Sequence, residues 1–71
     1  MKYKKLKPRC KNVLVILDNK IQVCKLIREE IYPPTGDFET ENIHLAIIEY
    51  SVNNKNLEVM IGINYVIFLK D

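Results

Sequence analysis

The sequence predicts a single small, mainly β domain, and three features of its 71 residues carry that prediction. Short apolar stretches rich in Val, Ile, Leu and Tyr recur along the chain, as they do in β-strands. Clusters of Asp, Asn and Lys, which favour tight turns, separate these stretches. A chain that is 48% hydrophobic is also too apolar for a disordered protein. Five such strands follow one another in an order that suits a small, closed, strongly bent barrel.

The first predicted strand of the domain is Asn12–Leu17, with the sequence NVLVIL. It is short, rich in β-branched residues and apolar at successive positions rather than alternate ones. A strand of this kind is covered on both faces. We therefore expect it in a barrel wall, a sandwich or a contact between subunits.

Residues 19–31 allow two structures. In the first, Asp18–Lys20 forms a hairpin turn and the following segment is a second strand. In the second, Asp18 caps a helix that Pro33 and Pro34 terminate. The first structure gives the barrel. The second gives an α+β alternative, a strand, a helix and a three-stranded antiparallel meander.

The remainder of the chain predicts a loop and three more strands. The loop is Tyr32–Asn42, which contains Pro33 and Pro34. The apolar sequence EVMIGINYVIFLK is thirteen residues long, which exceeds the usual length of one strand. A glycine within a strand pattern often marks a bend, so we expect a break near Gly62–Asn64. The predicted strands are Ile43–Val52, Leu57–Ile61 and Tyr65–Leu69.

The charge is unevenly distributed along the chain, although the formal net charge is only +2. Residues 1–11 hold six of the eleven basic residues and none of the nine acidic ones, which predicts a basic N-terminal arm on a single domain of residues 12–71. Such arms often contact phosphate groups. The candidate nucleic-acid contacts in this arm are Lys2, Lys4, Lys5, Lys7, Arg9 and Lys11.

No pattern of catalytic or metal-binding residues is present. The chain has one histidine, His44, and no nucleophile or phosphate-binding motif. Its two cysteines, Cys10 and Cys24, form neither a disulfide framework nor a metal-ligand spacing, which favours a reducing compartment such as the cytoplasm. No apolar run approaches the ~18 residues that a membrane span needs. We expect neither an enzyme nor a cofactor.

Two stretches resemble the two sequence motifs of the Sm-like family. In the first, Leu14 and Ile16 hold alternating apolar positions, Asp18-Asn19-Lys20 stands where the family has Asp-Gly-Arg, and Asn42-Ile43 resembles its Asn-Leu pair. In the second, MIGINYVIFL matches the family motif in length and apolar spacing. Gly62-Ile63 stands where the family has Arg-Gly. The resemblance covers roughly residues 12–30 and 42–69.

This resemblance implies a five-stranded, strongly bent barrel that forms a ring. Neighbouring subunits of the family pair the fourth strand of one with the fifth of the next, here the edges of Leu57–Ile61 and Tyr65–Leu69. It also implies a pocket for an RNA base to which Asn42 and Asn64 would contribute.

Two functions follow as hypotheses. The first is a small, self-associating, Sm-like module that binds single-stranded RNA, with the basic arm along the phosphates. The second is an accessory or inhibitor protein of a virus or mobile element, with no nucleic-acid role. Such a protein would dock on another protein through a sheet edge or through the loop Tyr32–Asn42.

Overall fold

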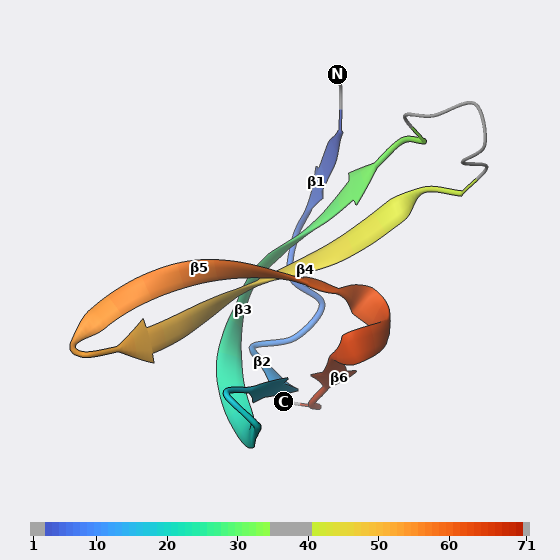
Figure 1. Cartoon of the computed structure of the whole chain (residues 1–71). Helices are drawn as coiled ribbons and strands as arrows, with labels where there is room; N and C mark the ends of the chain where they lie inside the picture. Colours follow the sequence, from blue (N-terminus) through green and yellow to red (C-terminus); the bar gives the residue numbers. More distant parts are fainter. Residues whose placement is uncertain (1–2, 35–40, 71) are drawn as a thin grey trace.

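The structure, a computed structural model, describes residues 3–34 and 41–70. Lys2 and the middle of the predicted loop Tyr32–Asn42 lie outside this part of the chain. The described residues form a mainly β protein, as predicted (Figure 1). Its elements are β1 (Lys4–Leu6), β2 (Asn12–Leu17), β3 (Lys20–Tyr32), β4 (Ile43–Val52), β5 (Lys55–Gly62), the 3₁₀ turn η1 (Ile63–Tyr65) and β6 (Ile67–Phe68).

All strand pairs are antiparallel and form one six-stranded sheet. Its order is β5-β4-β3-β2-β6, with β1 paired to β3 beyond the end of β2. The last strand thus returns to the first strand of the β2–β3 hairpin, and Figure 1 shows β6 beside β2 near the C-terminus. β5 and β6 are the two outermost strands, and within the described residues they do not pair with each other. The sheet is therefore not closed into a barrel.

Two-residue turns set the register of both long hairpins. Asp18 and Asn19 have φ values of 52° and 61°, and they join Leu17 to its partner Lys20. Asn53 and Asn54 have φ values of 51° and 65° and join β4 to β5 in the same way. Asp and Asn tolerate this left-handed conformation, which matches the twist of the flanking strands.

The segment that the sequence left open between strand and helix is the strand β3, so the hairpin prediction is confirmed and the helical alternative is wrong. The first part of β3 pairs with β2 and its second part pairs with β1. The pairing of β3 with β4 shifts register between Leu26 and Arg28. Such a bulge bends a strand. Because β3 is thirteen residues long, one edge of it can pair with β2 and then with β1.

The predicted break near Gly62–Asn64 is also confirmed. β5 ends at Gly62, η1 follows, and the chain re-enters the sheet as the two-residue strand β6. The predicted last strand, Tyr65–Leu69, was therefore too long, because the 3₁₀ turn η1 extends to Tyr65. Gly62 has a φ of −55°, so it is not needed for a left-handed conformation. Its lack of a side chain matters for space, because a Cβ atom there would lie 3.2 Å from the ring of Tyr65.

The hydrophobic core lies on the inner face of the bent sheet. Alternate residues of β2 and β3 contribute to it, together with the middle of β4 and one residue that follows η1. Each large aliphatic side chain buried there stabilises the fold by about 1.5–3 kcal/mol. The buried members are Val13, Val15, Cys24, Leu26, Ala46, Ile48 and Val66.

No helix in the described part of the chain has the length and apolar character needed to cross a bilayer.

Candidate nucleic-acid interface

The segment predicted as a basic arm contributes to the sheet and to its connections. Lys4 and Lys5 belong to β1, where they pair with Ile31 and Glu30 of β3. Lys7, Arg9 and Lys11 lie in the connection from β1 to β2 and are exposed. Two of these basic residues therefore belong to the sheet, and the other three lie in the connection beside it.

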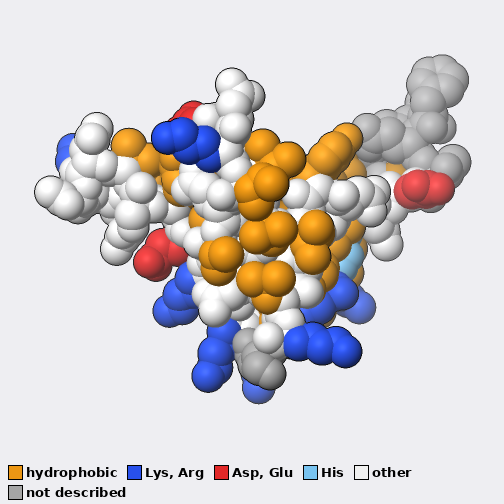
Figure 2. All heavy atoms as spheres, turned by 90° about the horizontal axis from the view of Figure 1, so that it is seen from below, with side chains coloured by type: hydrophobic (Ala, Val, Ile, Leu, Met, Phe, Trp, Pro, Cys, Tyr) orange, Lys and Arg blue, Asp and Glu red, His pale blue; other side chains and the backbone are white. Residues whose placement is uncertain are grey.

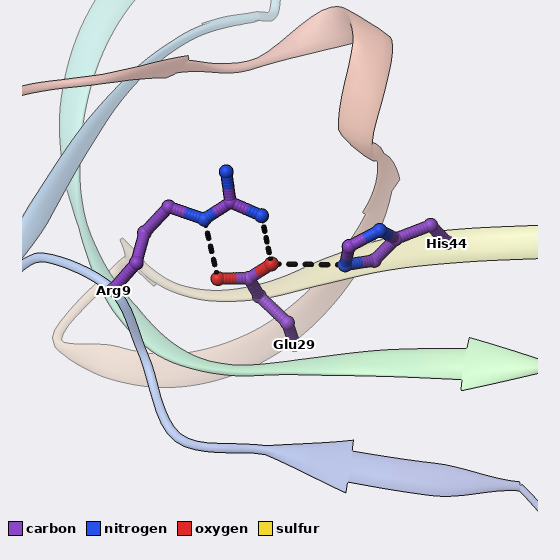
Figure 3. A network of polar contacts seen from close by, with 3 residues as sticks. All are labelled: Arg9, Glu29 and His44. Atoms are coloured by element: carbon purple, nitrogen blue, oxygen red, sulfur yellow. Dashed lines mark hydrogen bonds and ion pairs between the residues drawn. The ribbon is translucent and has the colours of Figure 1, made fainter.

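Arg9 is held by a buried carboxylate on β3 (Figure 3). Its Nε donates to Glu29 Oε2 at 2.9 Å and its Nη2 donates to Glu29 Oε1 at 2.6 Å. The Nε2 atom of His44, from β4, lies 2.9 Å from the same Oε1. Glu29 is only 2% exposed, so a cation must accompany it. The guanidinium also lies 4.1 Å above the ring of Phe68, a favourable cation–π distance.

A second buried carboxylate, Glu30, points to the other face of β3. It accepts hydrogen bonds from Arg28 Nε at 2.6 Å and from the Tyr32 hydroxyl at 2.7 Å. Arg28 also reaches Glu58 of β5 at 3.4 Å. Arg28, Glu30 and Tyr32 occupy alternate positions of one strand and therefore share one face. Together the two networks give both buried carboxylates their hydrogen-bond partners.

These contacts shift the pKa values of both glutamates below their ordinary value of 4.5. For Glu29 the main cause is the hydrogen bond from Arg9, and for Glu30 it is the hydrogen bond from the Tyr32 hydroxyl, followed by that from Arg28. Burial acts in the opposite direction on each carboxyl group, but it is outweighed. The hydrogen bond to Glu29 in turn raises the pKa of Arg9. The hydrogen bond to Glu30 raises the pKa of Arg28 in the same way, so both glutamates and both arginines stay charged at neutral pH.

We expect the protein to lose stability in acid for this reason. A carboxyl group whose pKa is lower in the folded chain stabilises the fold above its unfolded pKa, near 4.5. That contribution disappears as the pH falls through the lower, folded value. Urea unfolding followed from about pH 7 to about pH 3 should show constant stability down to about pH 5 and a steep fall below it. Unchanged stability near pH 3 would contradict the network.

A hollow of about 490 Å³ lies next to Arg9, between the β1–β2 connection and β3. Its basic lining residues are Arg9, Lys11 and Lys25. A neighbouring hollow of about 370 Å³ shares Arg9 and Cys10 with it and adds Lys70. We call the two hollows together the basic groove, with the basic residues Arg9, Lys11, Lys25 and Lys70.

A separate hollow of about 330 Å³ lies near the other end of the sheet. It is lined by Tyr3, Lys4 and Asn42, together with Ile31 and Pro33. The ring of Tyr3 stacks on that of Tyr32, with centroids 4.6 Å apart and planes at 16°. We call this hollow the tyrosine hollow. An aromatic ring, an amide and an ammonium group are the kinds of group that hold an unstacked base and its phosphate.

Comparison of the chain with protein-family models, with curated proteins and with solved structures returned no match.

Four of the eight predicted contacts line these two sites. Arg9 and Lys11 line the basic groove, and Lys4 and Asn42 line the tyrosine hollow. Asn64 lies in η1 and is exposed, and within the described residues it lines neither the basic groove nor the tyrosine hollow. Lys5 lies 5.9 Å from the centroid of the Tyr3 ring.

Two basic residues of the groove were missed from the sequence, and one of them could have been found. With Asp18 and Asn19 as a two-residue turn, counting outward along the hairpin places Lys25 opposite Asn12, as observed. The register of the β2–β3 hairpin therefore places Lys25 next to the end of the basic β1–β2 connection. Lys70 could not be placed in this way, because the return of β6 to β2 is a long-range pairing with no turn to define it.

The described residues contain no group of three or more His, Cys, Asp and Glu side chains arranged to hold a metal ion. Both cysteines are free thiols, and they have different surroundings. Cys24 is buried in the core, which raises its pKa, whereas the Cys10 thiol donates to the backbone oxygen of Asn12 at 3.2 Å. His44 contacts Glu29, so its defined partner is a carboxylate.

Proposed function

We propose that this chain is a small, non-enzymatic binding protein that self-associates and binds single-stranded RNA along the basic groove. The observation that carries the proposal is the convergence of Arg9, Lys11, Lys25 and Lys70 from three separate parts of the chain. Because Arg9 is compensated by Glu29, we expect Lys25 and Lys70 to supply much of the charge that a polyanion contacts. Phosphate contacts of this kind give affinity without sequence preference.

The tyrosine hollow supports the nucleic-acid part of the proposal. Stacking of a base on an aromatic side chain contributes about 1–3 kcal/mol and tolerates any base. Tyr3 is 41% exposed although it stacks on Tyr32, so part of its surface is accessible. Lys4 and Asn42 lie in the same hollow. In this proposal the basic groove holds phosphates and the tyrosine hollow holds a base.

The open sheet supports the self-association. In the described residues β5 and β6 each pair on one side only, so each leaves one edge of backbone donors and acceptors unpaired. Such edges are ready to pair with another chain. We propose that β5 of one subunit pairs with β6 of the next, as the resemblance to the Sm-like family implies. The sheet of each subunit would then continue into its neighbour, and a bent small barrel would form part of a ring.

The test is the salt dependence of binding to a fluorescent, single-stranded oligouridine. For single strands, log K falls with log salt by about 0.7 for each phosphate neutralised. Lys25→Gln and Lys70→Gln should therefore each weaken binding at low salt and lower the slope by about 0.7.

The matched control is Lys55→Gln, because Lys55 is an exposed lysine at the tip of the β4–β5 hairpin and lines neither site. It should leave the slope unchanged. Equal effects of all three substitutions would indicate a general charge effect, and absence of binding at low salt would refute the RNA-binding role.

One observation favours the second function, a protein-binding accessory or inhibitor. The β5 strand is eight residues long and its outer edge is unpaired, which suits the addition of a strand from another protein. Recovery of one stoichiometric protein partner that survives nuclease treatment, together with no salt-dependent RNA binding, would support this function over the first.

A further inference from the structure

The β2–β3 hairpin and β6 expose a second apolar surface, on the side of the sheet opposite the core. Ile16 and Ile21 lie opposite each other across the hairpin, and each is 69% exposed. Leu14 lies between Val23 and Ile67, both 61% exposed. We call this surface the outer apolar face. Its residues are Leu14, Ile16, Ile21, Val23, Tyr65 and Ile67.

Figure 2 shows hydrophobic side chains gathered in one continuous patch on this side of the molecule, seen from below Figure 1, where the hairpin tip and β6 lie. Most of the residues also line a common shallow depression of about 150 Å³. A monomeric protein rarely leaves such a surface in water, and a contiguous apolar patch usually marks a contact with another molecule.

The same strands already contribute their other face to the core. Val13 and Val15 of β2 are buried there, while Leu14 and Ile16 point outward. A strand that is apolar on both faces is normally covered on both. The rest of the bent sheet covers the inner face. The side chains of the outer face are exposed, so none of the described residues covers it.

We propose that a second copy of this chain covers the outer apolar face, so that the two hairpins stack face to face. Sheets stack about 10 Å apart with aliphatic side chains interdigitated between them. The five exposed side chains of the face, at on the order of 100 Å² each, would supply roughly 1,000 Å² when two copies meet, the smallest area expected of a specific interface.

The charges beside the face also suit a second copy. Lys25 lies opposite Glu49 of β4, on the same side of the sheet as Val23. A two-fold contact brings the same patch of both copies together, so Lys25 of one copy can meet Glu49 of the other. The carboxylate at the hairpin turn lies on the core side, because Asp18 accepts a hydrogen bond from the Tyr50 hydroxyl and Tyr50 packs against the core.

This contact differs from the edge pairing proposed above, since it uses side chains of β2 and β3 rather than the backbone edge of β5. The test is the mass of the full chain measured by light scattering over a range of concentrations. Ile16→Lys combined with Ile21→Lys should give half the wild-type mass at the same concentration. The sheet signal in circular dichroism should be unchanged, because both side chains are exposed.

The matched control is Ile43→Lys, a substitution at an exposed isoleucine outside the face, which should keep the wild-type mass. A double variant with the wild-type mass, or a wild type that stays monomeric at all concentrations, would overturn the proposal. Binding of a wild-type monomer to phosphatidylglycerol vesicles would assign the face to a membrane instead and would equally overturn it.

A measurement on the wild-type chain covers the case in which the double variant does not fold. A soluble paramagnetic agent broadens the methyl signals of exposed side chains in NMR spectra. The methyl groups of Ile16, Ile21 and Val23 should become protected as the protein concentration rises, whereas those of Ile43 should not. Equal broadening of all four residues at every concentration would refute the contact.

Discussion

Replacing Val66 with aspartate is expected to unfold the chain. Val66 is 8% exposed and belongs to the core cluster, although it stands outside a strand between η1 and β6. A carboxylate buried there without a partner would cost about 4 kcal/mol or more. A domain of this size is stable by roughly 4–10 kcal/mol, so the loss removes most or all of its stability. Circular dichroism and urea unfolding would measure it.

The matched control for Val66 is its neighbour in the chain. Ile67 is 61% exposed, and Ile67→Asp should change the free energy of unfolding by no more than about 0.5 kcal/mol. Because Ile67 belongs to the outer apolar face, the same variant should also self-associate less. Similar stability of the two variants would mean that the last segment does not pack as described.

Replacing Arg9 with alanine is the second change with a large expected effect. It leaves the carboxylate of Glu29, which is 2% exposed, with His44 as its remaining charged or polar partner in the network. Breaking a fully buried ion pair costs about 3–5 kcal/mol, but the Arg9 side chain is 51% exposed and water screens part of the interaction. We therefore expect a loss of about 2 kcal/mol in urea unfolding at neutral pH.

A second substitution separates the buried charge from other effects of losing Arg9. In the Arg9→Ala background, Glu29→Gln should recover part of the lost stability, because a neutral amide needs no cation. On its own, Glu29→Gln should destabilise the chain, since Arg9 then loses its acceptor. If the loss of unfolding free energy in the double variant equals the sum of the losses in the two single variants, the cost of Arg9→Ala lies in packing on Phe68 rather than in the ion pair.

The parts of the fold that could be predicted are those with local causes. Asp18-Asn19 and Asn53-Asn54 are turn sequences whose side chains tolerate left-handed backbone, and both hairpins form there. Gly62 marks the end of β5. The segment after Lys20 was harder to predict, because its charged second half also suits an amphipathic helix. Its strand conformation depends on pairing with β2, β1 and β4 at once.

The two adjacent glutamates show why local patterns were insufficient. A pair of acids in the middle of a segment normally indicates a solvent-exposed position. Here both are buried, because their cations and hydroxyl donors come from elsewhere in the fold or from alternate positions of the same strand. Arg9 lies twenty residues from Glu29 in sequence, and nothing local connects them.

The candidate site was predicted in part for the same reason. A cluster of basic residues near the N-terminus is visible in the sequence, and Arg9 and Lys11 do line the basic groove. The contributions of Lys25 and Lys70 depend on strand register and on the return of β6. That Asn42 lines the tyrosine hollow and Asn64 does not likewise depends on the tertiary arrangement.

Sedimentation velocity of the full chain with a fluorescent oligouridine, at about 50 mM and about 300 mM salt, tests the proposed function most directly. We predict a complex larger than one protein chain per RNA at low salt and its loss at high salt, since phosphate contacts weaken steeply with salt. A chain that sediments as a monomer and leaves the RNA unbound at the lower salt concentration would contradict both the self-association and the RNA binding.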